Sequence, residues 1–219
     1  LYENTTGGNN VAVGIYSLRN NTTASYNTAV GRSALCTNTT GACNTAIGYD
    51  SLKANITGAS NVAVGTSALK ANTTGDNNTA VGACALLTNT TGTSNVSIGL
   101  QSSLSNTTGT QNVVAGSFAL QSNTTGNCNT TIGHSSGYAG TTASCNVSIG
   151  NRSLCKITTG SSNVAVGLQS LFSNTTASNN TAVGSSALCL NTTGGLNVAT
   201  GAYSLASNTT GADNTASGG

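Results

Sequence analysis

Apolar and polar residues recur along this chain with one fixed period. Gly occupies residue 14 and every seventeenth residue after it as far as Gly218, and Asn does the same from Asn10 to Asn214. Thr fills a third constant place from Thr6 to Thr210. We number the repeat positions 1 to 17 from Leu1, so equivalent residues differ by multiples of 17. Repetition at a short fixed period indicates stacked, self-similar units.

Each copy contains one clear strand pattern between turn sequences. Positions 11–13, as in Val11-Ala12-Val13, place a small residue between two β-branched or apolar residues, which predicts a short strand. Positions 17 and 1, as in Ser17-Leu18, form a second short apolar segment. The Gly at position 14 and the Asn-Thr-Thr-Gly run are turn sequences. Helix is not expected, because Gly, Asn and Thr dominate the repeat.

A unit this small cannot bury its own apolar face, so it must stack on copies of itself. We therefore predict an all-β fold, a parallel β-solenoid of thirteen 17-residue repeats, in which residues 1–219 form a single array. Neighbouring coils should lie about 4.8 Å apart. Residues 134–145 depart most from the pattern, and we expect an irregular, loosened coil there.

The alternation also predicts which side chains point inward. We expect the Val or Ile of position 13 and the Leu of position 1 to form inward stacks. The small residue of position 12, beginning with Ala12, would then form an outward stripe that could pack against another chain. Constant polar residues should form structural ladders, and the Gly of position 14 should turn with positive φ or allow close backbone approach; their first members are Asn10, Asn27, Asn44, Thr6, Thr23, Thr40, Gly14, Gly31 and Gly48.

Composition excludes several function classes. Only 5% of residues are charged, against about 25% in an ordinary soluble domain. A net charge of +2 gives no basic patch for nucleic acid, and no apolar run reaches the roughly 20 residues of a membrane span. The chain lacks an initiating Met and begins in mid-pattern, so we expect a fragment of a longer fibrous protein.

Catalytic chemistry is not expected. His134 is the only His, and it occupies a variable position with no second His, carboxylate cluster or nucleophile–base pair beside it in the sequence. We therefore predict no catalytic residue, no metal site and no cofactor. Aromatic side chains also use variable positions, where they could contact a partner or ligand or simply be scattered surface residues. They include Tyr16, Tyr26, Tyr49, Phe118, Tyr138, Phe172 and Tyr203.

The runs Asn27–Leu35 and Asn180–Leu188, which read Asn-Thr-Ala-Val-Gly-x-x-Ala-Leu, resemble the head repeats of YadA-like trimeric autotransporter adhesins. Related repeats are similar to those of phage and viral tail fibres. The resemblance covers the whole chain and implies a left-handed β-roll, a homotrimer and binding to host or matrix surfaces. The chain departs from the adhesin pattern in its longer repeat and in having neither a coiled-coil stalk nor a membrane anchor.

Position 4 supplies Asn-x-Thr triplets in a turn that we expect to be exposed, so these residues are candidate glycosylation sites. They are Asn4, Asn21, Asn38, Asn55, Asn72, Asn89, Asn106, Asn123, Asn174, Asn191 and Asn208. Turn chemistry alone explains the same residues without any glycan.

Seven cysteines occupy variable positions, and Cys128 and Cys145 share position 9 in successive repeats. A spacing of about 4.8 Å between coils lies within the Cα range of a disulfide, so this pair is a candidate bridge. If positions 2 and 9 flank the turn on the same side, Cys36 with Cys43 or Cys145 with Cys155 is the alternative.

Two functions remain from the sequence. The first is a structural or adhesive segment of an extracellular fibre at a cell or virion surface, which self-associates as a homotrimer or filament and binds a host, matrix or carbohydrate surface. The alternative is an ice-binding β-solenoid that presents stacked Asn and Thr ladders.

Overall fold

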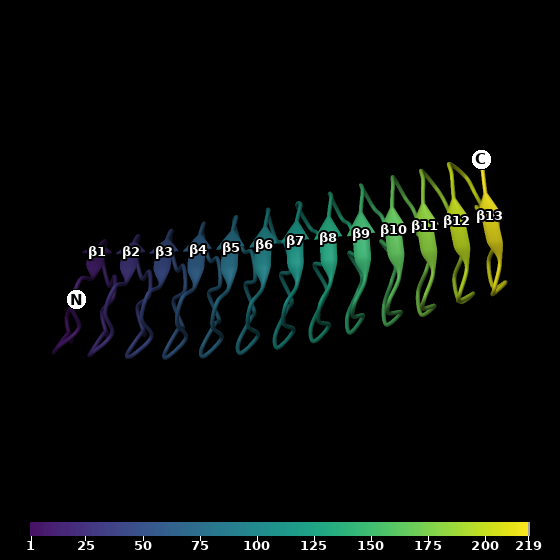
Figure 1. Ribbon diagram of the computed structural model, residues 1–219. Helices are drawn as coiled ribbons and strands as arrows, with labels where there is room; N and C mark the ends of the chain where they lie inside the picture. The colour runs from purple at the N-terminus through teal and green to yellow at the C-terminus, as the bar shows by residue number, and fades with distance from the viewer. Residues whose placement is uncertain (219) are drawn as a thin grey trace. The chain divides into compact units, whose positions relative to one another are not determined.

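The computed structural model describes residues 1–218, and each repeat contributes one three-residue strand at positions 11–13 (Figure 1). The strands are β1 (Val11–Val13), β2 (Thr28–Val30), β3 (Thr45–Ile47), β4 (Val62–Val64), β5 (Thr79–Val81), β6 (Val96–Ile98), β7 (Val113–Ala115), β8 (Thr130–Ile132), β9 (Val147–Ile149), β10 (Val164–Val166), β11 (Thr181–Val183), β12 (Val198–Thr200) and β13 (Thr215–Ser217). The described residues contain no helix, and therefore none that could cross a membrane.

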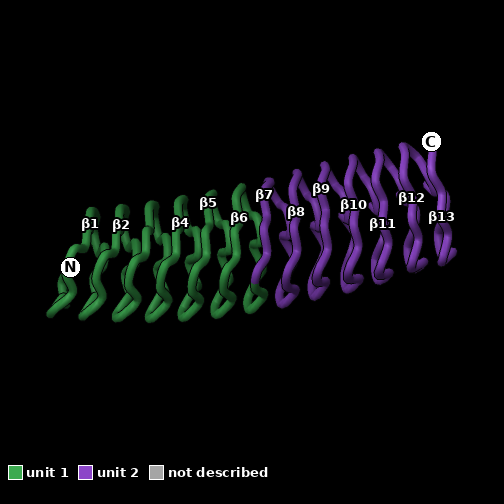
Figure 2. The backbone as a smooth tube through the Cα atoms, viewed as in Figure 1, with its two compact units in different colours: residues 1–110 green, residues 111–219 purple. Residues whose placement is uncertain are grey.

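The chain divides into two compact units, one of residues 1–110 and one that begins at Gln111 (Figure 2). Within the first unit, β1 to β6 pair in chain order, and within the second unit β7 to β13 do the same. These pairs are all parallel and join residues one repeat apart, as in Ala29 with Ala46. The predicted parallel β-solenoid is confirmed.

The strands face the opposite way from our prediction. The position-12 side chains, such as Ala29 and Ala46, are fully buried, whereas Val13 and Ile47 of position 13 are exposed. The prediction of an inward position-13 stack and an outward Ala12 stripe is therefore wrong. The Leu stack of position 1 is confirmed from Leu18 to Leu188, where every Leu of this position is buried; Leu1 and Leu205, in the first and last repeats, are exposed and partly exposed. Because those Leu side chains fill the thin interior, we infer that the facing strand has room only for Ala or Ser, and the bulkier β-branched residues lie outside.

Positive φ angles recur in every coil, among other places at the Gly of position 14 and at position 1, which is usually Leu. Gly14 has φ 126°, and a Cβ built there would lie 2.7 Å from the carbonyl carbon and oxygen of Gly31 in the next coil. Positive φ and close backbone approach, the two reasons expected for Gly at this position, therefore both apply. The buried Leu18 also has positive φ, at 46°. This conformation costs about 1–2 kcal/mol for a non-Gly residue, and burying the Leu side chain offsets it with about 1.5–3 kcal/mol.

The coil at residues 134–145 is not loosened, contrary to expectation. Strands β8 and β9 pair in register, and the Gly137 amide donates to the Ser153 carbonyl at 2.9 Å. The missing Leu at Gly137 coincides with a larger residue at position 12: a Cβ on Gly137 would lie 3.3 Å from Thr131 Cγ2. Opposed changes in volume therefore preserve the coil.

Candidate functional site: buried ladders and exposed faces

The position-4 asparagines form a ladder inside the coil rather than an exposed turn. Asn38 is fully buried, and its Nδ2 donates to the Gly41 carbonyl at 2.9 Å and to Oδ1 of Asn21 at 3.0 Å. Asn55 and Asn72 repeat both bonds, each to its own turn and to the preceding Asn. The nitrogen that would carry a glycan is thus engaged in two hydrogen bonds. Among the candidates, only the position-4 residues of the first and last repeats, Asn4 and Asn208, are partly exposed.

The position-10 asparagines form a second buried ladder. The backbone amide of Asn27 donates to Oδ1 of Asn10, and that of Asn44 donates to Oδ1 of Asn27, both at 2.9 Å. Nδ2 of Asn44 donates to the Gly58 carbonyl at 2.8 Å. Position 10 therefore joins each strand entrance to the turn of the next coil and satisfies buried backbone groups.

The threonine ladder lies one residue earlier than expected. At position 5, Thr22 Oγ1 donates to the Thr39 carbonyl at 3.1 Å, and Thr39 Oγ1 does the same to Ile56. At position 6, Thr6, Thr23 and Thr40 are exposed. No position-6 hydroxyl forms a hydrogen bond within the described part of the chain, although Thr occupies this position in all thirteen copies.

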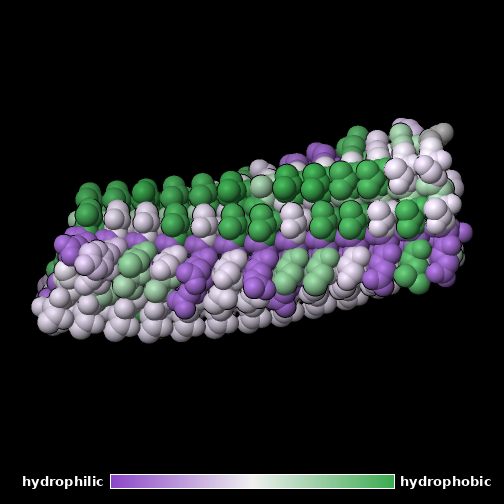
Figure 3. Space-filling view, viewed as in Figure 1, coloured by the Kyte–Doolittle hydropathy of each residue, from purple (hydrophilic) through white to green (hydrophobic). Residues whose placement is uncertain are grey.

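The outer sheet face is the main exposed apolar surface. We define it as the side chains of positions 11 and 13, and Figure 3 shows them as two rows along the strands of each unit. Position 13 is Val or Ile through most of the chain, and position 11 is Val or Thr. Ile47 and Ile98 of the first unit are 40% and 45% exposed, and Ile132 of the second unit is also exposed. Sequence reasoning assigned these residues to the interior and so missed this surface.

A buried carboxylate lies beside two lysines in the first unit. Oδ2 of Asp50 accepts from Lys53 Nζ at 3.2 Å and from Lys70 Nζ at 3.1 Å. The Asp50 side chain is only 4% exposed. Burial raises the pKa of the Asp50 carboxyl, but the hydrogen bonds and charges of Lys70 and Lys53 outweigh this effect and hold the pKa below its ordinary value of 3.8.

Asp50→Asn should therefore change the pH dependence of the free energy of unfolding. A depressed native pKa gives stability that is present above the unfolded pKa and is lost as pH falls through the native pKa. We expect the free energy of unfolding of the wild type to exceed that of Asp50→Asn by about 1 kcal/mol at pH 7; the difference is no larger because the lysines are partly solvated. The difference should disappear as the pH falls below 3.8. Denaturant melts from pH 7 to 2 measure this, and a constant gap would contradict the assignment.

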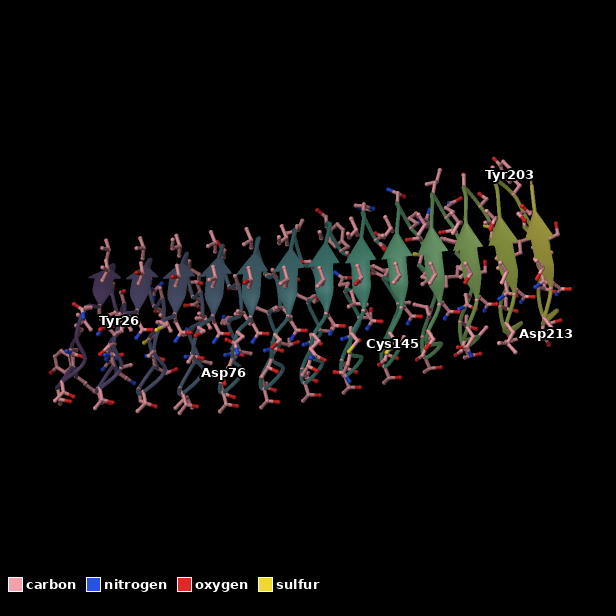
Figure 4. All side chains as sticks on the ribbon, viewed as in Figure 1. Tyr26, Asp76, Cys145, Tyr203 and Asp213 are labelled. Carbon is pink, nitrogen blue, oxygen red and sulfur yellow. The ribbon has the colours of Figure 1, made fainter. Side chains whose placement is uncertain are left out.

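The exposed aromatic residues divide into two groups. Arg19 lies 5.3 Å from the ring centroid of Tyr16, and Arg152 lies 4.9 Å from that of Phe172. By contrast, Tyr26 and Tyr203 are 64% and 69% exposed (Figure 4). Tyr2 is 84% exposed as well, and these three rings are the aromatic surfaces best suited to a partner.

All seven cysteines are free thiols, including the candidate pair Cys128 and Cys145. Cys128 Sγ donates to Oε1 of Gln111 at 3.3 Å. A disulfide needs Cβ atoms about 3.8 Å apart, whereas in-register side chains on neighbouring coils are about 4.8 Å apart, so regular stacking disfavours the bridge. Burial raises the pKa of the Cys189 thiol, against the opposing charge of Lys156, and a raised thiol pKa disfavours the reactive thiolate.

Within the described residues, no three His, Cys, Asp or Glu side chains lie close enough together to hold a metal ion. His134 is exposed and contacts Phe118 edge to face, with ring centroids 5.7 Å apart. Comparisons with protein-family models, with curated proteins and with solved structures give no match.

Proposed function

We propose that this chain is a non-catalytic structural and adhesive segment of an extracellular fibre, and that it self-associates as a homotrimer through the outer sheet face. The observation that carries this proposal is the exposure of the Val and Ile side chains of position 13 in both units. Contiguous apolar surface of this kind is uncommon on monomers and marks contact sites. The trimeric state is what the resemblance to YadA-like head repeats implies. The surface that we assign to it replaces the Ala12 stripe.

Under this proposal the variable positions bind the target, a host, matrix or carbohydrate surface outside the cell or virion. The exposed rings of Tyr26 and Tyr203 support this role, because aromatic faces stack on sugars and peptides with little loss of side-chain entropy. The low charge of the chain supports it as well, since few interactions would weaken with salt.

The native mass of the purified chain tests the proposal against the 21.3 kDa of one chain. We expect a species of three chains in light scattering at several concentrations. A continuous series of larger masses would indicate a filament instead of a trimer. A single-chain mass at every concentration would contradict self-association.

The fold changes which acceptor triplets a glycan can use. Asn77, Asn151 and Asn179 each begin an Asn-x-Ser/Thr triplet and lie on exposed positions. In a chain made by a glycosylating host, glycopeptide mapping of the folded protein should find sugar at these three residues and not at the buried Asn38 or Asn55. Sugar at the buried pair would contradict this assignment.

Ice binding is the second candidate, and the exposed position-6 threonines favour it. Their hydroxyls repeat at the spacing of the coils, about 4.8 Å, and are free to order water. The buried asparagine ladders cannot take part. A thermal hysteresis assay decides the matter: growth arrest that is lost in Thr57→Val/Thr74→Val would support ice binding, and no arrest in the wild type would exclude it.

A further inference from the structure

A groove of about 490 Å³ follows positions 2 and 3 of the first unit. Three of its lining residues are aliphatic, Ala54, Ala71 and Leu87. Its volume falls within the range of about 300–1,000 Å³ that is typical of small-molecule sites. All of its lining residues belong to repeats within residues 1–110, so the groove lies inside one compact unit.

Two threonines that line this groove contribute apolar rather than polar surface. Thr37 Oγ1 donates to the Lys53 carbonyl at 2.7 Å, and Thr88 Oγ1 donates to the Leu104 carbonyl at 2.9 Å. Since both hydroxyls are engaged with backbone, we infer that the γ-methyl groups are the parts left for a ligand. The groove therefore offers few partners for the hydroxyl groups of a sugar.

The remaining lining residues are Lys53 and Lys70, one repeat apart at position 2. Both ammonium groups donate to the same oxygen of Asp50. Each ammonium has three N–H donors and spends one on this contact. The lysine side chains are 41% and 42% exposed while Asp50 is buried, so the cluster presents one net positive charge and several free donors beside the aliphatic surface.

We propose that this groove binds a linear aliphatic monocarboxylate. The tail lies against Ala54, Ala71 and Leu87, and the carboxylate bridges the ammonium groups of Lys53 and Lys70. One negative charge balances the net charge of the cluster, and charge-assisted hydrogen bonds at this site are about twice as strong as neutral ones. A phosphate would bring more negative charge than the cluster balances.

Decanoate is the probe, titrated calorimetrically into the folded 219-residue chain at neutral pH and low salt. We expect saturable binding of one decanoate per chain. Decanol has the same tail and no charge, and it should bind at least about tenfold more weakly, because a hydrogen bond to a charged group contributes more than one to a neutral group. Equal affinities for the two probes, or no saturable binding of decanoate, would overturn the proposal.

Variants separate the two halves of the site. Asp50→Asn/Lys53→Gln/Lys70→Gln removes the cluster without leaving a buried unpaired charge, and it should abolish the preference for decanoate over decanol. Ala71→Leu should fill the groove and weaken the binding of both probes. Leu87→Asn should also weaken the binding of both, because it removes aliphatic surface from the groove. Lys156→Gln, a cation of the second unit outside the groove, is the matched control and should leave both affinities unchanged. Thermal melting checks that each variant is folded, and a preference that survives the triple substitution would refute the role of the lysines.

Discussion

Ile47→Asp/Ile98→Asp should reduce the native mass of the assembled protein to that of a single chain, 21.3 kDa. Both side chains belong to the outer sheet face of the first unit, on β3 and β6, and both are exposed in the single chain. In an assembly that covers this face, the two carboxylates of each chain would be buried without partners. The cost of burying an unpaired charge is several kcal/mol per group, which exceeds the gain from a standard apolar contact.

The fold of the single chain should survive this substitution. Replacing an exposed strand residue changes stability by about 1 kcal/mol or less, because no interior contact is lost. Ser60→Asp/Ser94→Asp is the matched control: it adds the same two charges to the same unit, at exposed position-9 residues with positive φ that Asp tolerates. Light scattering should show the control with the wild-type mass. Loss of assembly in both variants would indicate general charge repulsion, and assembly of both would place the contact elsewhere.

The period of the repeat was enough to predict the coil, but not which strand face turns inward. Val-Ala-Val alternation defines two faces of the strand but does not indicate which of them is buried. The opposing wall decides: buried Leu18 and Leu35 leave space for Ala29 and Ala46, so Val30 lies outward of them. The sequence does give the large Leu at position 1, and the volume of that side chain is the signal from which the inward face of the strand could have been predicted correctly.

The sequence is similarly ambiguous about the asparagines of position 4, which could lie either in an exposed turn or in the interior of the coil. An Asn-Thr-Thr-Gly run is typical of an exposed bend, yet Asn38 is buried because its amide can serve both its own turn and the neighbouring coil. The exceptions were informative, since Gly140 and Ile157 replace this Asn with apolar residues and never with charge. The groove beside Lys53 was missed because positions 2 and 3 vary between copies, although the triplet of Asp50, Lys53 and Lys70 was visible at spacings of 3 and 17.

Asn72→Ala should be strongly destabilising, by about 2–4 kcal/mol, although the change removes only an amide. Asn72 Nδ2 donates to Oδ1 of Asn55 and to the Gly75 carbonyl, both at 2.9 Å, and its Oδ1 accepts from Asn89 at 2.9 Å. Alanine removes all three bonds from a fully buried ladder and deprives Oδ1 of Asn55 of its donor, although the Gly75 carbonyl still accepts from Asn61 and Asn89 Nδ2 still donates to Gly92. Urea melts measure the loss, and Thr74→Ala, at an exposed position two residues away, should stay within about 0.5 kcal/mol of the wild type.

The chain itself supplies a replacement for the ladder that separates hydrogen bonding from packing. Gly140 and Ile157 occupy position 4 in successive coils, and a Cβ on Gly140 would lie 3.5 Å from Ile157 Cγ2, so the isoleucine extends toward the space of the missing Asn. Asn55→Gly/Asn72→Ile reproduces this pair in the first unit. We expect the double variant to be more stable than the sum of its single variants predicts, by about 0.5–3 kcal/mol of coupling, because large and small residues then fit together. Strict additivity would show that the natural exchange does not depend on the fit of Ile157 against Gly140.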